Sequence, residues 1–257
     1  MLIDSHAHLD MKAYDGDRDR VLTRAEQAGV ASIITIGVDL TSSLKGLELA
    51  HRYDALFSSV GYHPHEASRM NDTDLQQLEN LATDSKIMAW GEIGLDFYRC
   101  YSPAAVQRAV FEKQLEVARG MDLPVIIHSR DANHEVFGTL KNRKGRLRGA
   151  IHCFSGDYDL AMAFIELGFY ISIPGIVTYK KATRMQEVAS KIPLERLLVE
   201  TDAPFLTPDP ERGKRNEPAF IAYTAHAIAR LRGMDFEDLV RRTAENTKKL
   251  FNLPITL

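Results

Sequence analysis

The stretch Leu2-Ile-Asp-Ser-His-Ala-His8 decides the fold and opens the candidate site. It is an apolar, strand-like run that ends in two histidines two positions apart. Because alternate residues of a strand point to the same face, His6 and His8 project together, with α-carbons about 6.6 Å apart. This spacing suits two ligands of one metal ion. A lone histidine in an apolar run is more often a hydrogen-bonded core residue, so the interpretation depends on ligands elsewhere in the chain.

The same kind of run recurs along the chain. Seven more Val-, Ile- or Leu-rich runs alternate with longer amphipathic stretches, at residues 31–37, 56–61, 87–92, 125–128, 150–152, 169–173 and 196–200. This alternation predicts repeated β-α units with a parallel sheet. Residues 104–121, for example, carry apolar side chains at three- and four-residue spacings, which predicts a helix. A Pro-rich loop at 203–218 leads to two further helical segments, at 219–232 and 236–251.

Potential metal ligands stand at the ends of several of these runs. Besides the two histidines of the first run, they are Glu92, His128, His152 and Asp202. In an eight-stranded parallel barrel the carboxyl ends of all strands converge on one face, where active sites are built. Four imidazoles and two carboxylates that converge there predict a two-metal hydrolytic centre.

The expected fold is therefore α/β, a (β/α)8 TIM barrel with two additional C-terminal helical segments. The alternative is an open, doubly wound sheet. That architecture would not collect ligands so naturally from both its first and its last strand, and the chain lacks the glycine-rich phosphate loop that goes with it.

The composition fits one domain spanning residues 1–257. A chain of 257 residues with 45% hydrophobic residues can bury the core of a single α/β barrel. Residues 1–9 do not resemble a signal peptide, and no window approaches about 18 uncharged apolar residues, so we expect a cytoplasmic protein with no membrane span. Cys100 and Cys153 are expected to be free thiols.

The charge of the chain limits how it can bind a polyanion. A net charge of -3 and a pI near 6.3 give no overall electrostatic footprint for coating nucleic acid. Any polyanion must therefore be held locally.

Several motifs together resemble a known family. They are His-x-His at 6–8, Gly-Tyr-His-Pro-His at 61–65, Gly-Glu-Ile-Gly-Leu-Asp at 91–96, Pro-Val-Ile-Ile-His-Ser-Arg-Asp at 124–131, His-Cys-Phe-Ser-Gly at 152–156 and Glu-Thr-Asp-Ala-Pro at 200–204. Over essentially the whole chain the sequence resembles the TatD-type metal-dependent deoxyribonucleases of the amidohydrolase-like superfamily. The resemblance implies a barrel fold and hydrolysis, most commonly of DNA ends.

The resemblance also implies a ligand assignment, with no departure at the six positions. One ion is bound by His6, His8 and Asp202, the other by His128 and His152, and Glu92 bridges them. Two ions about 3.5 to 4 Å apart can clamp the oxygens of a displacement and lower the pKa of a shared water. Asp202 is the expected general base. Nitrogen and oxygen ligands without thiolate fit Zn, Mn, Co or Ni, and Mg less well.

Four further residues are candidates for binding substrate. His63 suits a hydrogen bond to a phosphate oxygen or a metal-bound water, although a turn role beside Pro64 is the alternative. Arg130 suits a bidentate phosphate contact, and its alternative is an ion pair with Asp131 or Asp96. Lys214 and Arg215 lie on a loop that either clamps a nucleic-acid backbone or carries solvated charge.

The sequence favours an exodeoxyribonuclease that acts on single-stranded or frayed DNA ends, with no obligate protein partner. An end-trimming enzyme contacts few phosphates, so a pI near neutrality is compatible with this function. The alternative is a carbonyl ester or amide hydrolase, such as an aminoacyl-RNA deacylase, because the same metal-activated water attacks a carbonyl carbon. A non-catalytic metal-binding scaffold would be expected to have lost a ligand, and none is missing.

Overall fold

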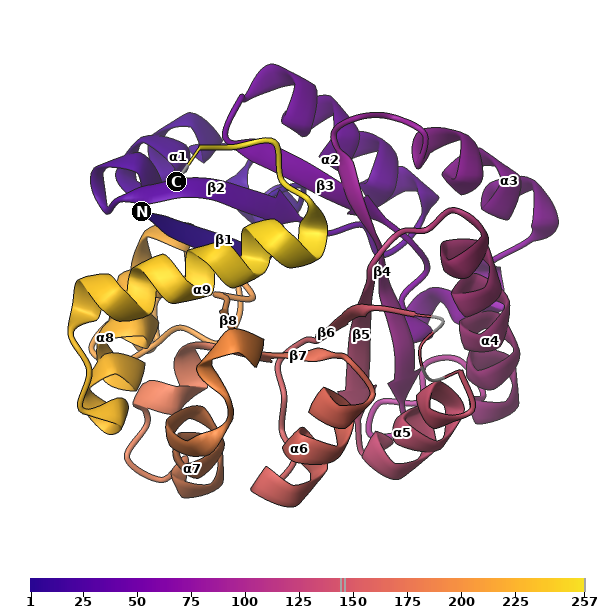
Figure 1. Cartoon of the computed structure of the whole chain (residues 1–257). Coiled ribbons are helices and arrows are strands. Elements are labelled where there is room, and N and C mark those ends of the chain that lie inside the picture. Colours follow the sequence, from indigo (N-terminus) through magenta and orange to yellow (C-terminus); the bar gives the residue numbers. More distant parts are fainter. Residues whose placement is uncertain (144, 146, 257) are drawn as a thin grey trace.

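The computed structural model describes residues 1–143, 145 and 147–256, and it confirms the parallel barrel (Figure 1). Neighbouring strands of its single eight-stranded sheet follow the order of the sequence, and every pair is parallel. The strands are β1 (Leu2–Ala7), β2 (Val30–Thr35), β3 (Leu56–Val60), β4 (Ile87–Asp96), β5 (Val125–Arg130), β6 (Gly149–Ile151), β7 (Tyr170–Ile173) and β8 (Leu197–Val199).

The two edges of the sheet meet at the mouth of the barrel. Ala7 and Ala203 form a parallel bridge between the end of β1 and the segment after β8. Beside it, the His8 N–H donates to the Ala203 carbonyl at 2.7 Å, and the Asp202 N–H donates to the His6 carbonyl at 2.9 Å. This seam brings residues from the first and last strands together, as a barrel requires.

Helices surround the sheet (Figure 1). Asp39, Asn71, Asp157 and Asp235 each accept a backbone N–H at a helix start, which satisfies one of the otherwise unpaired donors there. The α-helices are α1 (Arg18–Gln27), α2 (Leu40–Arg52), α3 (Asp72–Leu81), α4 (Ala104–Gly120), α5 (Asn133–Lys141), α6 (Tyr158–Glu166), α7 (Thr183–Lys191), α8 (Ile221–Arg232) and α9 (Phe236–Phe251). Short 3-10 helices are η1 (Lys12–Tyr14), η2 (Pro64–Arg69), η3 (Gly175–Thr178), η4 (Leu194–Arg196) and η5 (Pro218–Phe220).

The two C-terminal helices have different places in the barrel. Helix α8 packs against α7, whereas α9 packs against β1 and β8 and lies across them in Figure 1. Leu250 and Phe251 of α9 cluster with Ile3, near the amino end of β1, and with Leu198 of β8. Burying each such side chain stabilises the fold by roughly 1.5–3 kcal/mol. Helix α9 therefore closes the amino end of the barrel and leaves the carboxyl end open for chemistry.

Strand β4 runs four residues beyond the expected run at 87–92. It continues to Asp96, which pairs in register with Arg130 of β5. In the sequence Glu92 closes an apolar run. In the structure Glu92 lies inside β4, and its carboxylate points into the mouth of the barrel. Only glycine fits at Gly94, since its φ is +147° and a Cβ would clash with the carbonyl oxygen of His128.

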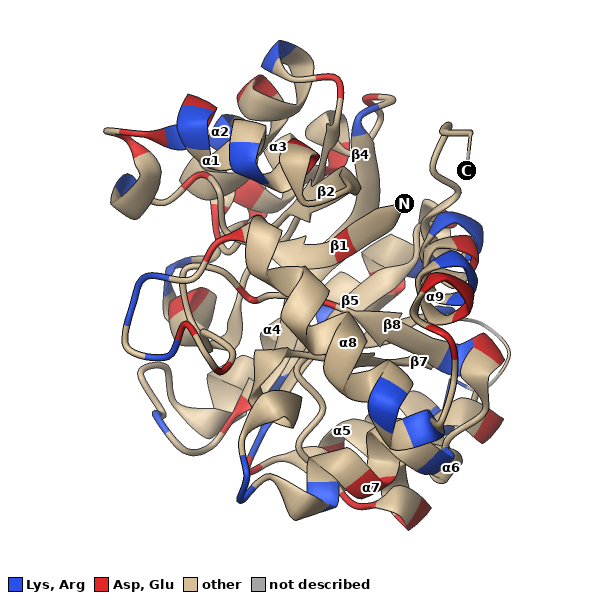
Figure 2. Ribbon diagram, turned by 90° about the vertical axis from the view of Figure 1, so that its left-hand side faces the viewer, with Lys and Arg blue, Asp and Glu red and all other residues tan. Residues whose placement is uncertain are grey.

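Acidic and basic residues are mixed over the outer helices, as Figure 2 shows on α9. Among the described residues, no helix has both the length and the apolar character needed to cross a membrane. The cytoplasmic location stays a prediction.

Candidate metal centre

All six predicted ligands converge at the carboxyl mouth of the barrel. His6, His8, Glu92 and His152 are each at most 5% exposed. His128 and Asp202 are only slightly more open, with side chains 16% and 13% exposed. The six residues thus meet as expected although they come from five different strands or the segments after them, and although Glu92 lies inside β4 and not at its end.

Three donor atoms, from His6, His8 and Asp202, form a first set with one carboxylate oxygen of Glu92. The Nε2 atoms of His6 and His8 lie 3.3 Å apart. They are 3.5 and 3.9 Å from Glu92 Oε2. They are 3.6 and 3.4 Å from Asp202 Oδ1.

This first set fits a divalent ion. The Nε2 atoms of His6 and His8 face each other beside two carboxylate oxygens, and a cation between them would accept one lone pair from each of the four atoms. For bonds of about 2.0–2.1 Å in tetrahedral geometry, ligand atoms are expected roughly 3.3–3.4 Å apart. The separation between His6 and His8 Nε2 is 3.3 Å.

A second set surrounds the other oxygen of the same carboxylate. Glu92 Oε1 lies 2.7 Å from His128 Nδ1, 3.6 Å from His152 Nε2 and 3.5 Å from His63 Nε2. His63 was expected near the substrate, and the structure places its Nε2 in this group. The His63 Nδ1 accepts the His65 N–H at 3.1 Å, so the proton of the neutral ring is on Nε2, which faces the centre as a donor. Each oxygen of Glu92 therefore faces a group of donors, and His152 lies between the two groups, since a ligand atom of its ring is also within 4.8 Å of ligand atoms of His6 and Asp202.

The electrostatics of the centre keep Glu92 ionised and favour positive charge at His152. Burial alone would raise the pKa of the Glu92 carboxyl, but the surrounding histidines outweigh it and hold that pKa well below its usual range. Burial alone would lower the pKa of His152, but the carboxylates of Glu200 and Glu92 raise it to about 10. Carboxylates that favour an imidazolium at this position also favour a divalent cation.

Two carboxylates that sequence reasoning did not assign hold the histidines in place. Asp96 Oδ2 lies 2.8 Å from His65 Nε2 and 3.2 Å from His128 Nε2. Glu200 Oε1 lies 3.0 Å from His152 Nδ1 and accepts the Cys153 N–H at 2.7 Å. Both are fully buried, and such partners fix the orientation of a metal-binding imidazole. In the sequence Glu200 closes the apolar run at 196–200, whereas Asp96 lies four residues past the expected run at 87–92.

Replacing Glu200 with glutamine should weaken metal affinity by about 10- to 100-fold, because the amide no longer provides a full negative charge beside His152. Competition with a coloured chelator would measure the change. Glu195→Gln is the matched control, since that carboxylate is 65% exposed and pairs with Arg242 on the outside. Equal affinity in wild type and Glu200→Gln would show that Glu200 does not support the centre.

Asp4 anchors the backbone next to Asp202. Its carboxylate accepts the Thr201 N–H at 2.9 Å and the Thr201 hydroxyl at 2.5 Å. Burial raises the pKa of Asp4 to about 7. Asp202, which follows Thr201, has a left-handed backbone with φ of 55°, a conformation that aspartate tolerates better than most residues. The anchored turn aims its carboxylate at His6 and His8.

Arg130 stands exposed at the end of β5, beside the centre. Its guanidinium lies 4.1 Å from the centre of the Tyr98 ring. Within the described part of the chain, neither Asp96 nor Asp131 forms a salt bridge with it. The position is thus compatible with the expected phosphate contact.

The two loop cations have carboxylate partners. Lys214 is 70% exposed and lies 2.6 Å from Glu211. Arg215 binds Asp17 through two bonds of 2.8 Å, and its guanidinium stacks on the Tyr14 ring. Arg215 therefore fastens this loop to the start of α1, and Lys214 remains the more accessible cation.

Both cysteines are free, as expected. Cys153 lies close enough to His152 and Glu200 for the three to share an ion. Burial raises the pKa of the Cys153 thiol well above its usual range, so without a cation beside it the thiol stays protonated.

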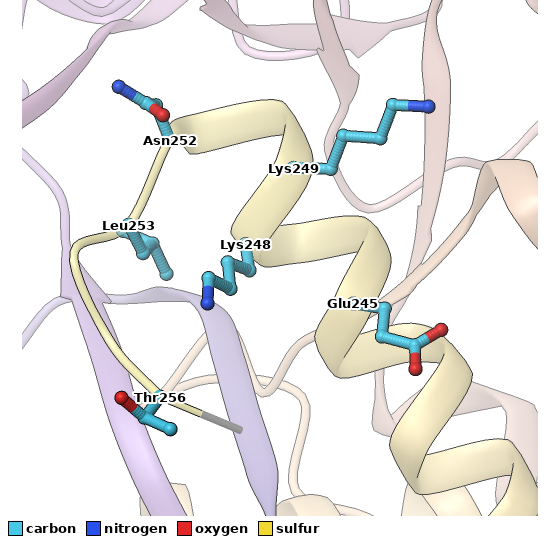
Figure 3. A pocket seen from close by; sticks show the side chains of 6 residues that line it. All are labelled: Glu245, Lys248, Lys249, Asn252, Leu253 and Thr256. Atoms are coloured by element: carbon cyan, nitrogen blue, oxygen red, sulfur yellow. The ribbon is translucent and has the colours of Figure 1, made fainter.

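A cavity of about 500 Å³ lies elsewhere, at the C-terminal end of α9 (Figure 3). Lys248 and Lys249 line it but point to different sides of the helix in Figure 3. It contains none of the predicted site residues. This cavity is therefore separate from the candidate metal centre.

Comparisons with known proteins agree with this geometry. The profile of the TatD related DNase family matches residues 3–252. The uncharacterized metal-dependent hydrolase YabD of Bacillus subtilis is 41% identical, over 98% of this chain and 100% of that protein. The 3'-5' ssDNA/RNA exonuclease TatD of Edwardsiella piscicida is 39% identical, over 98% of this chain and 100% of the Edwardsiella protein.

A solved structure shares the whole architecture. The crystal structure of YjjV, a TatD homologue from Escherichia coli, superposes with a TM-score of 0.93 at 34% identity, over 98% of each chain. The barrel, the gathered histidines and carboxylates and the match along nearly the full length agree with one another. The chain is a metal-dependent hydrolase that belongs to the TatD related DNase family.

Proposed function

We propose that this protein is an exodeoxyribonuclease that hydrolyses phosphodiester bonds at single-stranded or frayed DNA ends. One observation carries the proposal: two donor sets share Glu92, one at each carboxylate oxygen, beside an exposed arginine. A phosphodiester needs its attacking and its leaving oxygen stabilised together, and two adjacent cation sites are suited to that. The names of two relatives, both 3'-5' ssDNA/RNA exonuclease TatD, support the same substrate class.

The residues divide into two ion-binding groups. His6, His8 and Asp202 would hold one ion against Glu92 Oε2, and His128 and His152 would hold the other against Oε1. Bound divalent ions supply Lewis-acid stabilisation of phosphoryl oxygens and lower the pKa of water toward neutrality.

Other groups of the chain handle the proton and the phosphate. Asp202 accepts the proton of the attacking water at its carboxylate, which the anchored turn after β8 holds in the mouth. Arg130 donates two N–H groups to a phosphate oxygen pair. His63, beside Glu92 Oε1, donates a hydrogen bond to the same phosphate. Lys214 adds attraction for the strand from the loop, and any part played by Arg215 acts through the position of that loop.

The test is an assay of metal-reconstituted protein on end-labelled single-stranded DNA, run beside an aminoacyl ester substrate. The proposal predicts stepwise shortening of the DNA and slow turnover of the ester. Rapid ester hydrolysis with intact DNA would replace the nuclease with a carbonyl hydrolase. Asp202→Asn protein is the control for contaminating nuclease.

Metal analysis should find two divalent ions per chain when metal is saturating. The reason is that six candidate ligands exceed the three protein ligands of a usual single catalytic zinc site. Elemental analysis after gel filtration in metal-containing buffer, or anomalous scattering from crystals, would count the ions. A single ion under both conditions would show that Glu92 does not bridge.

A further inference from the structure

Three aromatic side chains stand exposed on the loops around the metal centre. Tyr98 and Tyr101 follow β4 and are 58% and 67% exposed, and Phe205 follows β8 and is 49% exposed. Within the described ranges, these two loops carry every large aromatic side chain that is exposed. Apolar rings gathered in water next to a catalytic centre indicate a binding surface.

The rings border both halves of the centre. The Phe205 ring lies 6.1 Å from the ring of His8, which belongs to the first donor set. The Tyr101 ring lies 4.8 Å from the ring of His65, which shares Asp96 with His128 of the second set. A molecule whose reacting atom sits at Glu92 therefore has an exposed aromatic ring on each side.

A cation joins the aromatic surface. The guanidinium of Arg130 covers the Tyr98 ring at 4.1 Å, which holds a positive charge at the level of the exposed rings. Aromatic rings alternating with cations are the composition with which proteins bind single-stranded nucleic acid, because bases stack on the rings and phosphates meet the cations. In a duplex the faces of the bases are already stacked on one another, so a paired end offers fewer faces to these rings.

We infer that Phe205, Tyr101 and the Tyr98–Arg130 pair form a stacking rim for unpaired bases on both sides of the phosphodiester bond at the metal centre. The inference rests on the proposed nuclease function and adds how the strand is recognised. Every base has a π-face, so the rim accepts any sequence but requires an unpaired end.

The test compares two single strands of the same length. One has ordinary nucleotides, and the other has stable abasic residues at the two positions nearest each end, so that the phosphates remain and the bases are missing. For the wild type, the abasic ends should raise KM by about 5- to 100-fold, the range expected for the loss of base stacking. This comparison needs no variant.

Variants of Phe205 and Tyr101 test whether their rings cause the difference in KM between the two strands. Phe205→Ala and Tyr101→Ala should each raise KM on the ordinary strand by about 5- to 100-fold and change it little on the abasic strand. Phe205→Tyr and Tyr101→Phe keep a ring and should behave like the wild type. Leu231→Ala is the control, because that side chain is 40% exposed on α8, outside the loops of the rim.

The possible results distinguish failure of the stacking rim from failure of the proposed nuclease function. A wild type that degrades both strands equally well overturns the stacking rim and leaves the nuclease intact. Alanine variants that lose the same factor on both strands overturn it too, since the rings would then support the centre instead of the bases. A metal-loaded wild type that cleaves neither strand overturns the proposed function, and the rim with it.

Discussion

Replacing Asp202 with asparagine should lower kcat by about three powers of ten or more. Asparagine has nearly the same shape but cannot accept a proton from the attacking water, and it removes one negative charge from the first donor set. The fold should survive, because the Asp202 N–H still donates to the His6 carbonyl and Asp4 still anchors Thr201. Single-turnover cleavage of DNA at saturating metal would measure the loss.

The control for Asp202→Asn is Asp122→Asn. Asp122 also has a left-handed backbone, with φ of 53°, but it follows α4 and pairs with Arg148 away from the mouth. The control should keep wild-type activity, which separates backbone effects from chemistry. Full activity of a folded, metal-loaded Asp202→Asn protein would exclude Asp202 as the base.

Arg130→Ala should cost about 2 to 4 kcal/mol in kcat/KM on DNA, the range for losing a charged donor to a transition-state oxygen. The guanidinium is exposed over Tyr98 and supports neither donor set, so metal content and thermal stability should stay close to those of the wild type. The effect on a neutral ester should be small, because no phosphate is present to bind.

Two further variants sharpen the result for Arg130. Arg130→Lys keeps the charge but not the planar pair of donors, so its activity should fall between wild type and alanine. Arg230→Ala removes an exposed cation from the outer helix α8 and should change little. Equal losses on DNA and on the neutral ester would show that Arg130 supports the metal site, and would favour the carbonyl hydrolase.

Local sequence patterns were sufficient to predict the barrel. A strand repeats every two residues and a helix every 3.6, and both periods are visible in short windows of the chain. The run at 236–251 matches α9 in full. The strand ends were harder to predict, as β4 shows. Its apolar pattern continues past Glu92, and the close approach of Gly91 and Gly94 to β5 is visible only in three dimensions.

The sequence by itself determined the fold class and indicated the six candidate ligands, because a parallel barrel directs all strand ends to one mouth whatever the details of packing. Only the tertiary structure decided which partners hold those ligands. Asp96 reaches His128 across 32 positions, and Glu200, just after β8, reaches His152. Such pairs, and the rim of exposed aromatics, depend on strand register and on the path of each loop, which hydrophobic periodicity does not encode.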